Sequence, residues 1–266
     1  MTFREKYGPW ALITGASEGV GRAFARRIAA EGVNLVLVAR REGPLAELAA
    51  ELTRDFGVEA VPLSVDLFST DAPDRIRAAI GRRDIGLYIS NAGADPFGAR
   101  FLDLDLEKWQ GLINVNVNNL VAMCHRFGTE MRAKGRGGII VIGSGACYGG
   151  GRFMATYSGA KGFSLNFTES LWSELQPYGV DVLYMALAMT DTPELRRHMA
   201  ERGQTVPENI ASPDDVAAKG LESLGQLHLV NWGQEDDQDG FVSASAAARR
   251  GRIGVIDQST RRVFGD

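Results

Sequence analysis

"WALITGASEGVGRAF", residues 10–24, joins an apolar run to a glycine-rich turn and then to a helical pattern. The run is typical of a buried strand, and Gly15, Gly19 and Gly21 open the helix behind it. A pyrophosphate needs close backbone approach, free N–H groups and the positive end of a helix, and glycines at a strand-to-helix turn supply all three. A plain tight turn would also use glycines, but the position after the first strand favours a dinucleotide-binding site.

Outward from this stretch, short apolar runs alternate with amphipathic segments as far as residue 187. This alternation is typical of βαβ units and a parallel sheet. The sequence therefore predicts an α/β protein with a Rossmann-type, doubly wound parallel sheet flanked by helices, in a single domain over 1–266. Strands are predicted at 10–14, 34–39, 59–66, 85–90, 138–144 and 180–187, and helical patterns at 21–32, 44–52, 72–80, 106–131 and 157–176.

Beyond residue 190 the pattern loosens. We expect a substrate lid at about 189–210, then a helix that begins at Ser212/Pro213, and a variable tail at about 226–266. "GQEDDQDG" (233–240) resembles a calcium loop, but its twelfth position would be Ala246, where a bidentate glutamate is needed. We interpret it as a solvated acidic turn and predict no metal site.

Composition narrows the class of protein. The 266 residues are 45% hydrophobic and 23% charged with a formal net charge of -4, which favours a soluble globular protein over a disordered chain or a basic nucleic-acid binder. The sequence has no signal-peptide pattern and no apolar stretch of membrane-spanning length. Cys124 and Cys147 lack metal-ligand spacing and fit a reducing compartment, so we expect a cytoplasmic protein without membrane or nucleic-acid partners.

"TYSGAK" (156–161) places Tyr157 and Lys161 four residues apart, on one face of a predicted helix. A free tyrosine has a pKa of about 10, and lowering it to near 7 needs about 4 kcal/mol of preference for the phenolate. A partly buried ammonium could supply much of that preference. The alternative is an exposed pair on an ordinary helix, because this spacing recurs by chance.

Other motifs accompany the pair. Thr14 precedes the glycine turn to give T-G-x-x-x-G-x-G, "NAG" stands at 91–93, Asn116 lies in "WQGLINVN", and Ser144 stands thirteen residues before Tyr157. Over about residues 8–225 the chain resembles the short-chain dehydrogenase/reductase family, whose members carry these motifs in this order. Several motifs together are far more specific than any one of them.

The resemblance implies a catalytic role for each residue. Tyr157 would exchange a proton with a carbonyl oxygen while hydride moves to or from the carbon, and Ser144 would polarise that oxygen. Lys161 would lower the pKa of Tyr157 and hydrogen-bond the nicotinamide ribose, and Asn116 would hold a water in a proton path. Two alternatives stay open: Ser144 as a strand-end cap, and a neighbouring asparagine in place of Asn116, namely Asn114, Asn118 or Asn119.

The end of the second strand bears on the choice of cofactor. It reads "LVLVARRE", with Arg40 and Arg41 and no carboxylate at the strand end itself, which favours NADP(H) over NAD(H). Ser17 is a further candidate phosphate ligand, whereas Glu18 occupies a position that is often basic in NADP-preferring members of the family. A solvated arginine pair is the alternative. The expected cofactor-binding residues are Gly15, Ser17, Gly19, Val20, Gly21, Arg40, Arg41, Asp66 (on the adenine), Asn91 (mainly structural), Ala92, Gly93, Tyr157, Lys161 and Thr192.

The substrate side departs from the family. Leu187 and Ala188 replace its usual Pro-Gly, which puts the nicotinamide orientation and the pocket shape in question. We expect the pocket to be built from 94–101, 145–153 and 189–210 and to take a hydrophobic ketone or alcohol. His198 is interpreted as a surface helix residue. The expected apolar lining, in which each residue could equally be packing, is Tyr148, Phe153, Met154, Met189 and Met199.

The leading hypothesis is an NADP(H)-dependent carbonyl reductase or alcohol dehydrogenase with a Ser/Tyr/Lys/Asn tetrad and a small-molecule substrate. A non-catalytic nicotinamide-binding regulator is the first alternative, although it would have no use for an acidic tyrosine. An epimerase or dehydratase on a related scaffold is the second, disfavoured because no large C-terminal substrate domain is evident. The resemblance also implies a homodimer or homotetramer that pairs the helices at about 106–131 and 157–176.

Overall fold

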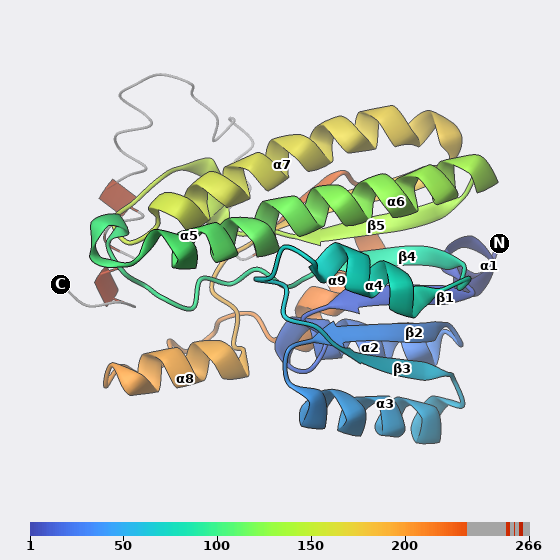
Figure 1. Ribbon diagram of the computed structural model, residues 1–266, viewed down its shortest axis with the longest axis horizontal. Coiled ribbons are helices and arrows are strands. Elements are labelled where there is room, and N and C mark those ends of the chain that lie inside the picture. The colour runs from blue at the N-terminus through green and yellow to red at the C-terminus, as the bar shows by residue number, and fades with distance from the viewer. Residues whose placement is uncertain (233–253, 256–257, 259–260, 263–266) are drawn as a thin grey trace.

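Seven parallel strands form one sheet in the order β3-β2-β1-β4-β5-β6-β7. The computed structural model describes residues 1–232, 254–255, 258 and 261–262. The chain runs from β1 to one edge of the sheet and returns to the middle for β4 (Figure 1). The strands are β1 (Trp10–Thr14), β2 (Asn34–Ala39), β3 (Ala60–Ser64), β4 (Ile85–Ser90), β5 (Gly137–Ile142), β6 (Val180–Leu187) and β7 (Leu229–Trp232).

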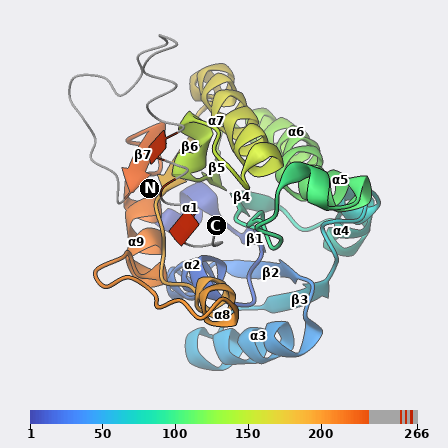
Figure 2. The ribbon, with the colours of Figure 1, turned by 90° about the vertical axis from the view of Figure 1, so that its left-hand side faces the viewer.

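Helices cover both faces of this sheet (Figure 2). One face carries α2 (Gly19–Ala30), α3 (Glu42–Phe56) and α9 (Pro213–Ser223). The other carries α4 (Ala72–Ile80), α5 (Leu106–Ile113), α6 (Asn119–Lys134) and α7 (Ala155–Leu175). The short α1 (Phe3–Tyr7) and the helix α8 (Pro193–Glu201) lie at opposite ends of the molecule (Figure 1).

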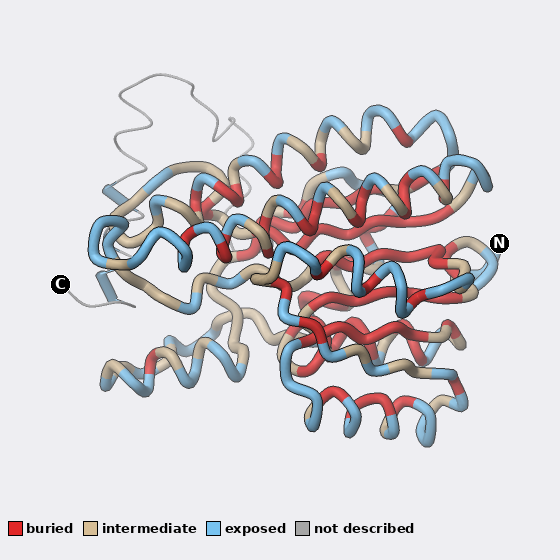
Figure 3. The backbone as a smooth tube through the Cα atoms, in the orientation of Figure 1, coloured by how far each residue is buried: buried red, intermediate tan, exposed pale blue. Residues whose placement is uncertain are grey.

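The central strands β1, β4 and β5 are buried at every position because their side chains pack into a core on each side of the sheet (Figure 3). Ala11 and Ile13 of β1 point into the core beneath α2, and Trp10 and Leu12 point into the core beneath α6 and α7. This is the expected alternation of a strand whose two faces are both covered by helices. The predicted α/β, doubly wound architecture is confirmed.

Most predicted elements are found, with shifted ends or small additions. The predicted strand at 59–66 is shorter, Ala60–Ser64, and the one at 138–144 is Gly137–Ile142. The predicted helix over 106–131 extends to Lys134 and contains a π-helical turn at Asn114–Asn118. Neither α1 nor β7 was predicted, because five and four residues are too few to show a periodic pattern.

Side-chain caps begin the helices that follow β6. The Thr192 hydroxyl accepts a hydrogen bond from the Leu195 N–H (3.1 Å) at the start of α8. The Ser212 hydroxyl does the same for the Asp215 N–H (3.1 Å) at the start of α9, so the predicted helix start at Ser212/Pro213 is confirmed.

Two further predictions from the sequence concern membrane-spanning segments and the C-terminal tail. Among the described residues, no helix has the length and apolar character needed to cross a membrane. The acidic stretch 233–240, and most of the tail expected at about 226–266, lie outside the described residues.

Candidate active site

A cavity of about 800 Å³ opens beyond the carboxyl ends of the central strands. Its wall is formed by the turns that follow β1, β4, β5 and β6, together with parts of α7 and α8. In a doubly wound sheet this edge, next to the point where the strand order reverses, is where ligands bind. The predicted site residues that line it are Gly15, Gly19, Val20, Asn91, Ala92, Gly93, Ser144, Tyr157, Lys161 and Thr192.

The turn after β1 is shaped to admit an anion. Gly15 has a φ of +65°, and a Cβ on Gly21 would lie 2.2 Å from the Gly15 carbonyl oxygen. The side chain of Glu18, the N-cap residue of α2, makes no hydrogen bond to the first turn of that helix. The N-terminal N–H groups of α2 therefore stay available, and the turn fits a dinucleotide pyrophosphate.

Asn91 joins the turn after β4 to the turn after β1. Its side-chain amide donates to the carbonyl oxygens of Thr14 (3.0 Å) and Gly15 (3.1 Å). The Thr14 hydroxyl in turn accepts from the N–H groups of Asn91 (3.0 Å) and Ala92 (3.2 Å). These bonds fix two strand ends on opposite sides of the switch point.

Tyr157 and Lys161 lie one turn apart near the start of α7. Lys161 is 5% exposed, and its ammonium donates to the Ile142 carbonyl oxygen (3.2 Å) and lies 5.5 Å from the centroid of the Tyr157 ring. Ser144, just after β5, hydrogen-bonds Tyr157 with its side chain, and its hydroxyl also accepts from the Ala146 N–H (3.2 Å). A serine, a tyrosine and a lysine therefore share one corner of the cavity.

The acidity of the tyrosine differs from our expectation. Burial raises the pKa of Tyr157 to about 12, although the hydrogen bond from Ser144 opposes the rise. Burial also lowers the pKa of Lys161 to about 8. The expected fall toward 7 is absent because the Lys161 ammonium bonds the Ile142 carbonyl oxygen, while the burial of Tyr157 disfavours the charged phenolate.

Asn116 stands in the π-helical turn between α5 and α6. The Asn119 N–H bonds the Asn114 carbonyl oxygen five residues back, which widens the turn. Asn116 is 5% exposed, its amide donates to the Leu112 carbonyl oxygen (3.0 Å), and its Oδ1 has no hydrogen-bond partner among the described residues. A Cβ on Gly93 would lie 2.3 Å from this oxygen and 3.3 Å from the Lys161 ammonium.

The three other asparagines of this turn are committed elsewhere. Asn114 and Asn119 donate to the carbonyl oxygens of Phe68 (3.0 Å) and Leu67 (2.7 Å), and Asn118 donates to the side chain of Asn114 (2.6 Å). Of the four, Asn116 is the one beside Gly93 and Lys161.

Several residues expected at the cofactor do not line the cavity. Ser17 and Gly21 are buried beneath the glycine turn. Arg40 and Arg41 are exposed just after β2. Asp66 is exposed after β3, and its carboxylate accepts from the Phe68 N–H (3.1 Å).

The substrate side agrees only in part with expectation. Tyr148, Met154 and Met189 line the cavity, whereas Phe153 and Met199 do not. His198, expected at the surface, lines the cavity from α8, because this helix turns that face toward the cavity. The departures Leu187 and Ala188 line it too, beside Leu195.

Asp95 also lines the cavity and was not singled out from the sequence. One carboxylate oxygen accepts from the Phe97 N–H (2.8 Å), and the other, Oδ2, is buried and has no hydrogen-bond partner among the described residues. Burial raises the pKa of Asp95, and its negative charge raises the pKa of Tyr157. Nothing in the local pattern distinguishes it from an ordinary turn aspartate.

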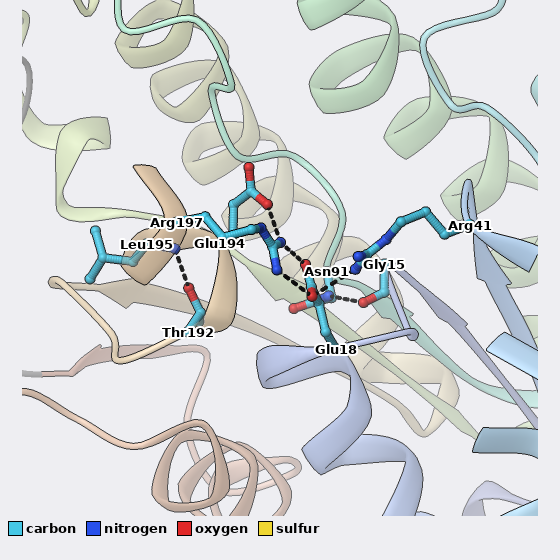
Figure 4. A network of polar contacts seen from close by, with 8 residues as sticks. All are labelled: Gly15, Glu18, Arg41, Asn91, Thr192, Glu194, Leu195 and Arg197. Carbon is cyan, nitrogen blue, oxygen red and sulfur yellow. Dashed lines mark hydrogen bonds and ion pairs between the residues drawn. The ribbon is translucent and has the colours of Figure 1, made fainter. Parts of the chain in front are cut away.

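A cluster of charged side chains spans the mouth of the site (Figure 4). The Glu18 carboxylate contacts the guanidinium groups of Arg41 (2.6 Å) and Arg197 on α8 (2.5 and 3.1 Å). Arg197 also contacts Glu194 of its own helix (2.5 Å). We call this set, Glu18, Arg41, Glu194 and Arg197, the Glu18 cluster.

Comparison with known proteins agrees with this geometry. The model of the short chain dehydrogenase family matches residues 9–203. A 7β-hydroxysteroid dehydrogenase of Mediterraneibacter gnavus is 35% identical over 238 residues, which cover 89% of this chain and 90% of that one.

Solved structures of short-chain dehydrogenases also resemble this chain. A structure of a 7β-hydroxysteroid dehydrogenase superposes with a TM-score of 0.83 at 30% identity and covers 100% of both chains. A short-chain dehydrogenase from Sphingobium yanoikuyae in complex with NADPH superposes with a TM-score of 0.75 at 29% identity and covers 94% of both chains. With the family's motifs on matching elements, the chain belongs to the short chain dehydrogenase family, whose enzymes transfer hydride between NAD(P) and a ketone or alcohol.

Proposed function

We propose that the protein is an NADP(H)-dependent enzyme that interconverts a bulky apolar ketone and its secondary alcohol, with Tyr157 as the acid and base. The observation that carries this proposal is the meeting of Ser144, Tyr157 and Lys161 in one corner of a large cavity at the switch point of the sheet. A regulator that only binds a nucleotide has no need of this arrangement.

The nicotinamide cofactor supplies or accepts the hydride when it is bound. The uncapped start of α2 and the Gly15 and Gly21 backbone would hold its pyrophosphate. Asn91, Ala92 and Gly93 form the turn that would lie near the adenosine half of the cofactor. Asp66 would accept a hydrogen bond from the adenine amino group. Thr192 lies against Gly19, where its Cγ2 would be 3.2 Å from an added Cβ, and so holds α8 close to the glycine turn.

Proton transfer belongs to the residues of α7 and the turn after β5. In reduction, the Tyr157 hydroxyl gives its proton to the substrate oxygen, and in oxidation the phenolate takes it back. The Ser144 hydroxyl donates a hydrogen bond to the same oxygen and stabilises the charge that develops on it. Lys161 holds a positive charge beside the ring, and the free oxygen of Asn116 connects it to solvent through a water.

NADP(H) is the cofactor we assign. Arg40 and Arg41, and no carboxylate, are the first two residues after β2, where an acidic residue would select NAD(H), and this suits a ribose 2′-phosphate. Ser17, in the glycine turn after β1, adds a hydroxyl. A structural relative described in complex with NADPH supports the assignment.

A steroid-like or similarly bulky ketone is the substrate class we favour. The side chains on the substrate side of the cavity are largely apolar, with Tyr148, Met154, Leu187, Met189 and Leu195 among them. Such a lining binds a ligand mainly by removing apolar surface from water. The similarity to 7β-hydroxysteroid dehydrogenases supports this class.

We further propose a homo-oligomer built on the long helices. Ile113, Val121 and Phe163 expose apolar side chains on α5, α6 and α7, and Phe163 stacks on Phe167 with ring centroids 5.7 Å apart. Pairing of these helices with a second copy would remove this apolar surface from water. Sedimentation analysis distinguishes a dimer or tetramer from a monomer.

The test is NADPH and NADH oxidation against steroid, aromatic, aliphatic and sugar ketones, with Tyr157→Phe as the control. We expect turnover of bulky apolar ketones with NADPH and a loss of at least about 10³-fold in Tyr157→Phe while NADPH binding persists. Turnover that survives in Tyr157→Phe contradicts the assigned acid. Tight NADPH binding without turnover of any ketone favours the regulator.

A further inference from the structure

The Glu18 cluster places a carboxylate where a phosphate is expected to bind. The Arg41 guanidinium lies 2.6 Å from Glu18, so any phosphate held by this guanidinium comes close to the Glu18 oxygens. A 2′-phosphate and a carboxylate repel one another, and Glu18 also competes with the phosphate for Arg41. Taken alone, Glu18 would therefore disfavour NADP(H).

Arg197, on α8, offsets the negative charge of Glu18. It meets both oxygens of Glu18 with a bidentate contact, 2.5 Å to Oε1 and 3.1 Å to Oε2. This is the geometry in which a guanidinium binds a carboxylate most strongly. Glu194 holds the same guanidinium at 2.5 Å from within α8, so Arg197 is directed toward the glycine turn (Figure 4).

We propose that Arg197 is a cofactor-specificity residue: by pairing with Glu18 it neutralises this carboxylate and leaves Arg41 free for the 2′-phosphate. The inference rests on the NADP(H) function proposed above. It assigns the positioning role to a side chain on α8, in the segment expected to form a lid, rather than to a residue of the glycine turn. NAD(H) has a hydroxyl in place of the phosphate and would not depend on Arg197.

Burial and charge in the cluster are consistent with this assignment. The side chain of Glu18 is 26% exposed, while those of Arg41 and Arg197 are each 46% exposed. Partial burial alone would raise the pKa of Glu18, but hydrogen bonds from Arg197 and Arg41 lower it, so the carboxylate stays ionised. The hydrogen bonds that Arg197 donates to Glu18 and Glu194 raise the pKa of Arg197. When a phosphate binds the Arg41 guanidinium, Arg197 still forms an ion pair with Glu18.

The neighbouring arginine of α8 offers a matched control. Arg196 forms its own bidentate pair with Asp191, with two contacts of 2.6 Å, and it is not part of the Glu18 cluster. Arg196→Gln removes the same charge from the same helix without exposing Glu18. Its effect measures what the loss of any arginine from α8 does to cofactor binding.

The experiment measures the dissociation constants of NADPH and NADH by calorimetry for the wild type, Arg197→Gln, Arg197→Lys, Arg196→Gln and the double variant Glu18→Gln/Arg197→Gln. We expect Arg197→Gln to weaken NADPH binding about three- to tenfold, the scale of a partly exposed charge, and to leave NADH binding within about twofold. The double variant should regain the NADPH affinity. Arg196→Gln and Arg197→Lys should keep it, and the difference should shrink at high salt.

Several results would overturn the inference. Equal weakening of NADPH and NADH in Arg197→Gln means that Arg197 only holds α8 in place, and no weakening means that its contact with Glu18 is a surface ion pair. Failure of the double variant to regain NADPH affinity means that Glu18 is not the charge being neutralised. The wild type tests the proposed function separately, because a protein that binds neither cofactor, or prefers NADH, contradicts that function whatever the variants do.

Discussion

At the scale of single residues, Tyr157 is held between opposing neighbours. After burial, which raises its pKa, the largest influence is the hydrogen bond from Ser144, which lowers it, and the negative charge of Asp95 raises it again. Oxidation of an alcohol needs the phenolate, so its rate rises with pH toward the pKa of Tyr157. Removing Ser144 or Asp95 should therefore shift the pH profile of alcohol oxidation in opposite directions.

We expect Ser144→Ala to raise the pKa of Tyr157 and move the rising limb of the oxidation profile to higher pH. It should also lower kcat about 10²-fold, because a donor to the substrate oxygen is lost. Asp95→Asn should move the same limb to lower pH, since a nearby negative charge is removed. The measurement is kcat/KM for alcohol oxidation with NADP⁺ against pH, and displacement of both variants in one direction would contradict this account.

Lys161 is a second residue whose burial has a measurable effect. One pKa unit corresponds to about 1.4 kcal/mol, so the fall in its pKa from 10.5 to about 8 opposes folding by about 3 kcal/mol at pH 7. Between these values the unfolded chain binds more protons than the folded protein, and wild-type stability therefore rises with pH in that window.

Lys161→Met should accordingly abolish turnover and raise the free energy of unfolding at pH 7 by about 2 kcal/mol, because a buried ammonium is replaced by an apolar chain of similar length. This advantage should diminish as the pH rises from 8 to 10.5. Urea unfolding at several pH values checks it, with Tyr157→Phe as an inactive variant that keeps the ammonium. A variant less stable than the wild type at pH 7 would show that the bond to Ile142 outweighs the burial of charge.

At the scale of elements, the strand-to-helix turn depends on two glycines for different reasons. Gly15 has a positive φ, whereas Gly21 is needed for space, since a Cβ there would meet the Gly15 carbonyl oxygen at 2.2 Å. Gly21→Ala should lower the free energy of unfolding by about 2 kcal/mol or more and weaken NADPH binding. Gly159→Ala, on an exposed position of α7 with nothing within 4 Å of the new Cβ, should be neutral or stabilising by up to about 1 kcal/mol. Equal unfolding midpoints for the two variants would refute the steric argument.

The elements also show where sequence reasoning succeeds. Strands such as Ile85–Ser90 were predicted at their observed bounds because six consecutive apolar or small residues stand between polar turns. The π-helical turn at Asn114–Asn118 could not be predicted, since it differs from an α-helix by one shifted hydrogen bond that leaves the apolar pattern intact. The strand Leu229–Trp232 was missed because its four residues are too few to show a periodic pattern.

At the scale of the whole molecule, one end of the sheet carries the cavity and the other carries contacts that stabilise the fold. The cavity lies at the carboxyl ends, and α1 packs at the amino ends, where the Tyr7 hydroxyl donates to Asp181 at the start of β6 (2.6 Å). Arg136 donates to the carbonyl oxygens of Glu5 (3.2 Å) and Gly8 (3.0 Å) and so ties α1 to the start of β5. Function is thus concentrated at one end and much of the anchoring at the other.

Tyr7→Ala should therefore separate stability from binding. Losing its ring, which packs beside Gly138, and its bond to Asp181 should lower the free energy of unfolding by about 3 kcal/mol. The dissociation constant of NADPH should stay within about twofold of the wild type. Thermal unfolding and calorimetry on the same preparation check both, and a weakened cofactor complex would show that the two ends of the sheet are coupled.

The sequence predicts the site residues that belong to motifs, but not the others. Ser144, Tyr157 and Lys161 stand at fixed spacings, so the sequence alone indicates that they belong together. Asp95 and Arg197 carry no such spacing, and Arg197 reaches Glu18 across 179 residues of chain. Contacts of this kind depend on how α8 lies over the glycine turn, which no local pattern encodes.

The strand order has a consequence for the chain as it is being made. β1 lies in the middle of the sheet. Its partner β2 follows soon after it in the chain, but its other edge stays unpaired until β4 is made, whose pairing residues lie about 75 positions after those of β1. Until then the growing polypeptide has an apolar strand with one unpaired edge, and unpaired strand edges of this kind promote aggregation with other chains. Chaperone demand during translation should be greatest in that interval and should fall once the segment Ile85–Ser90 has emerged.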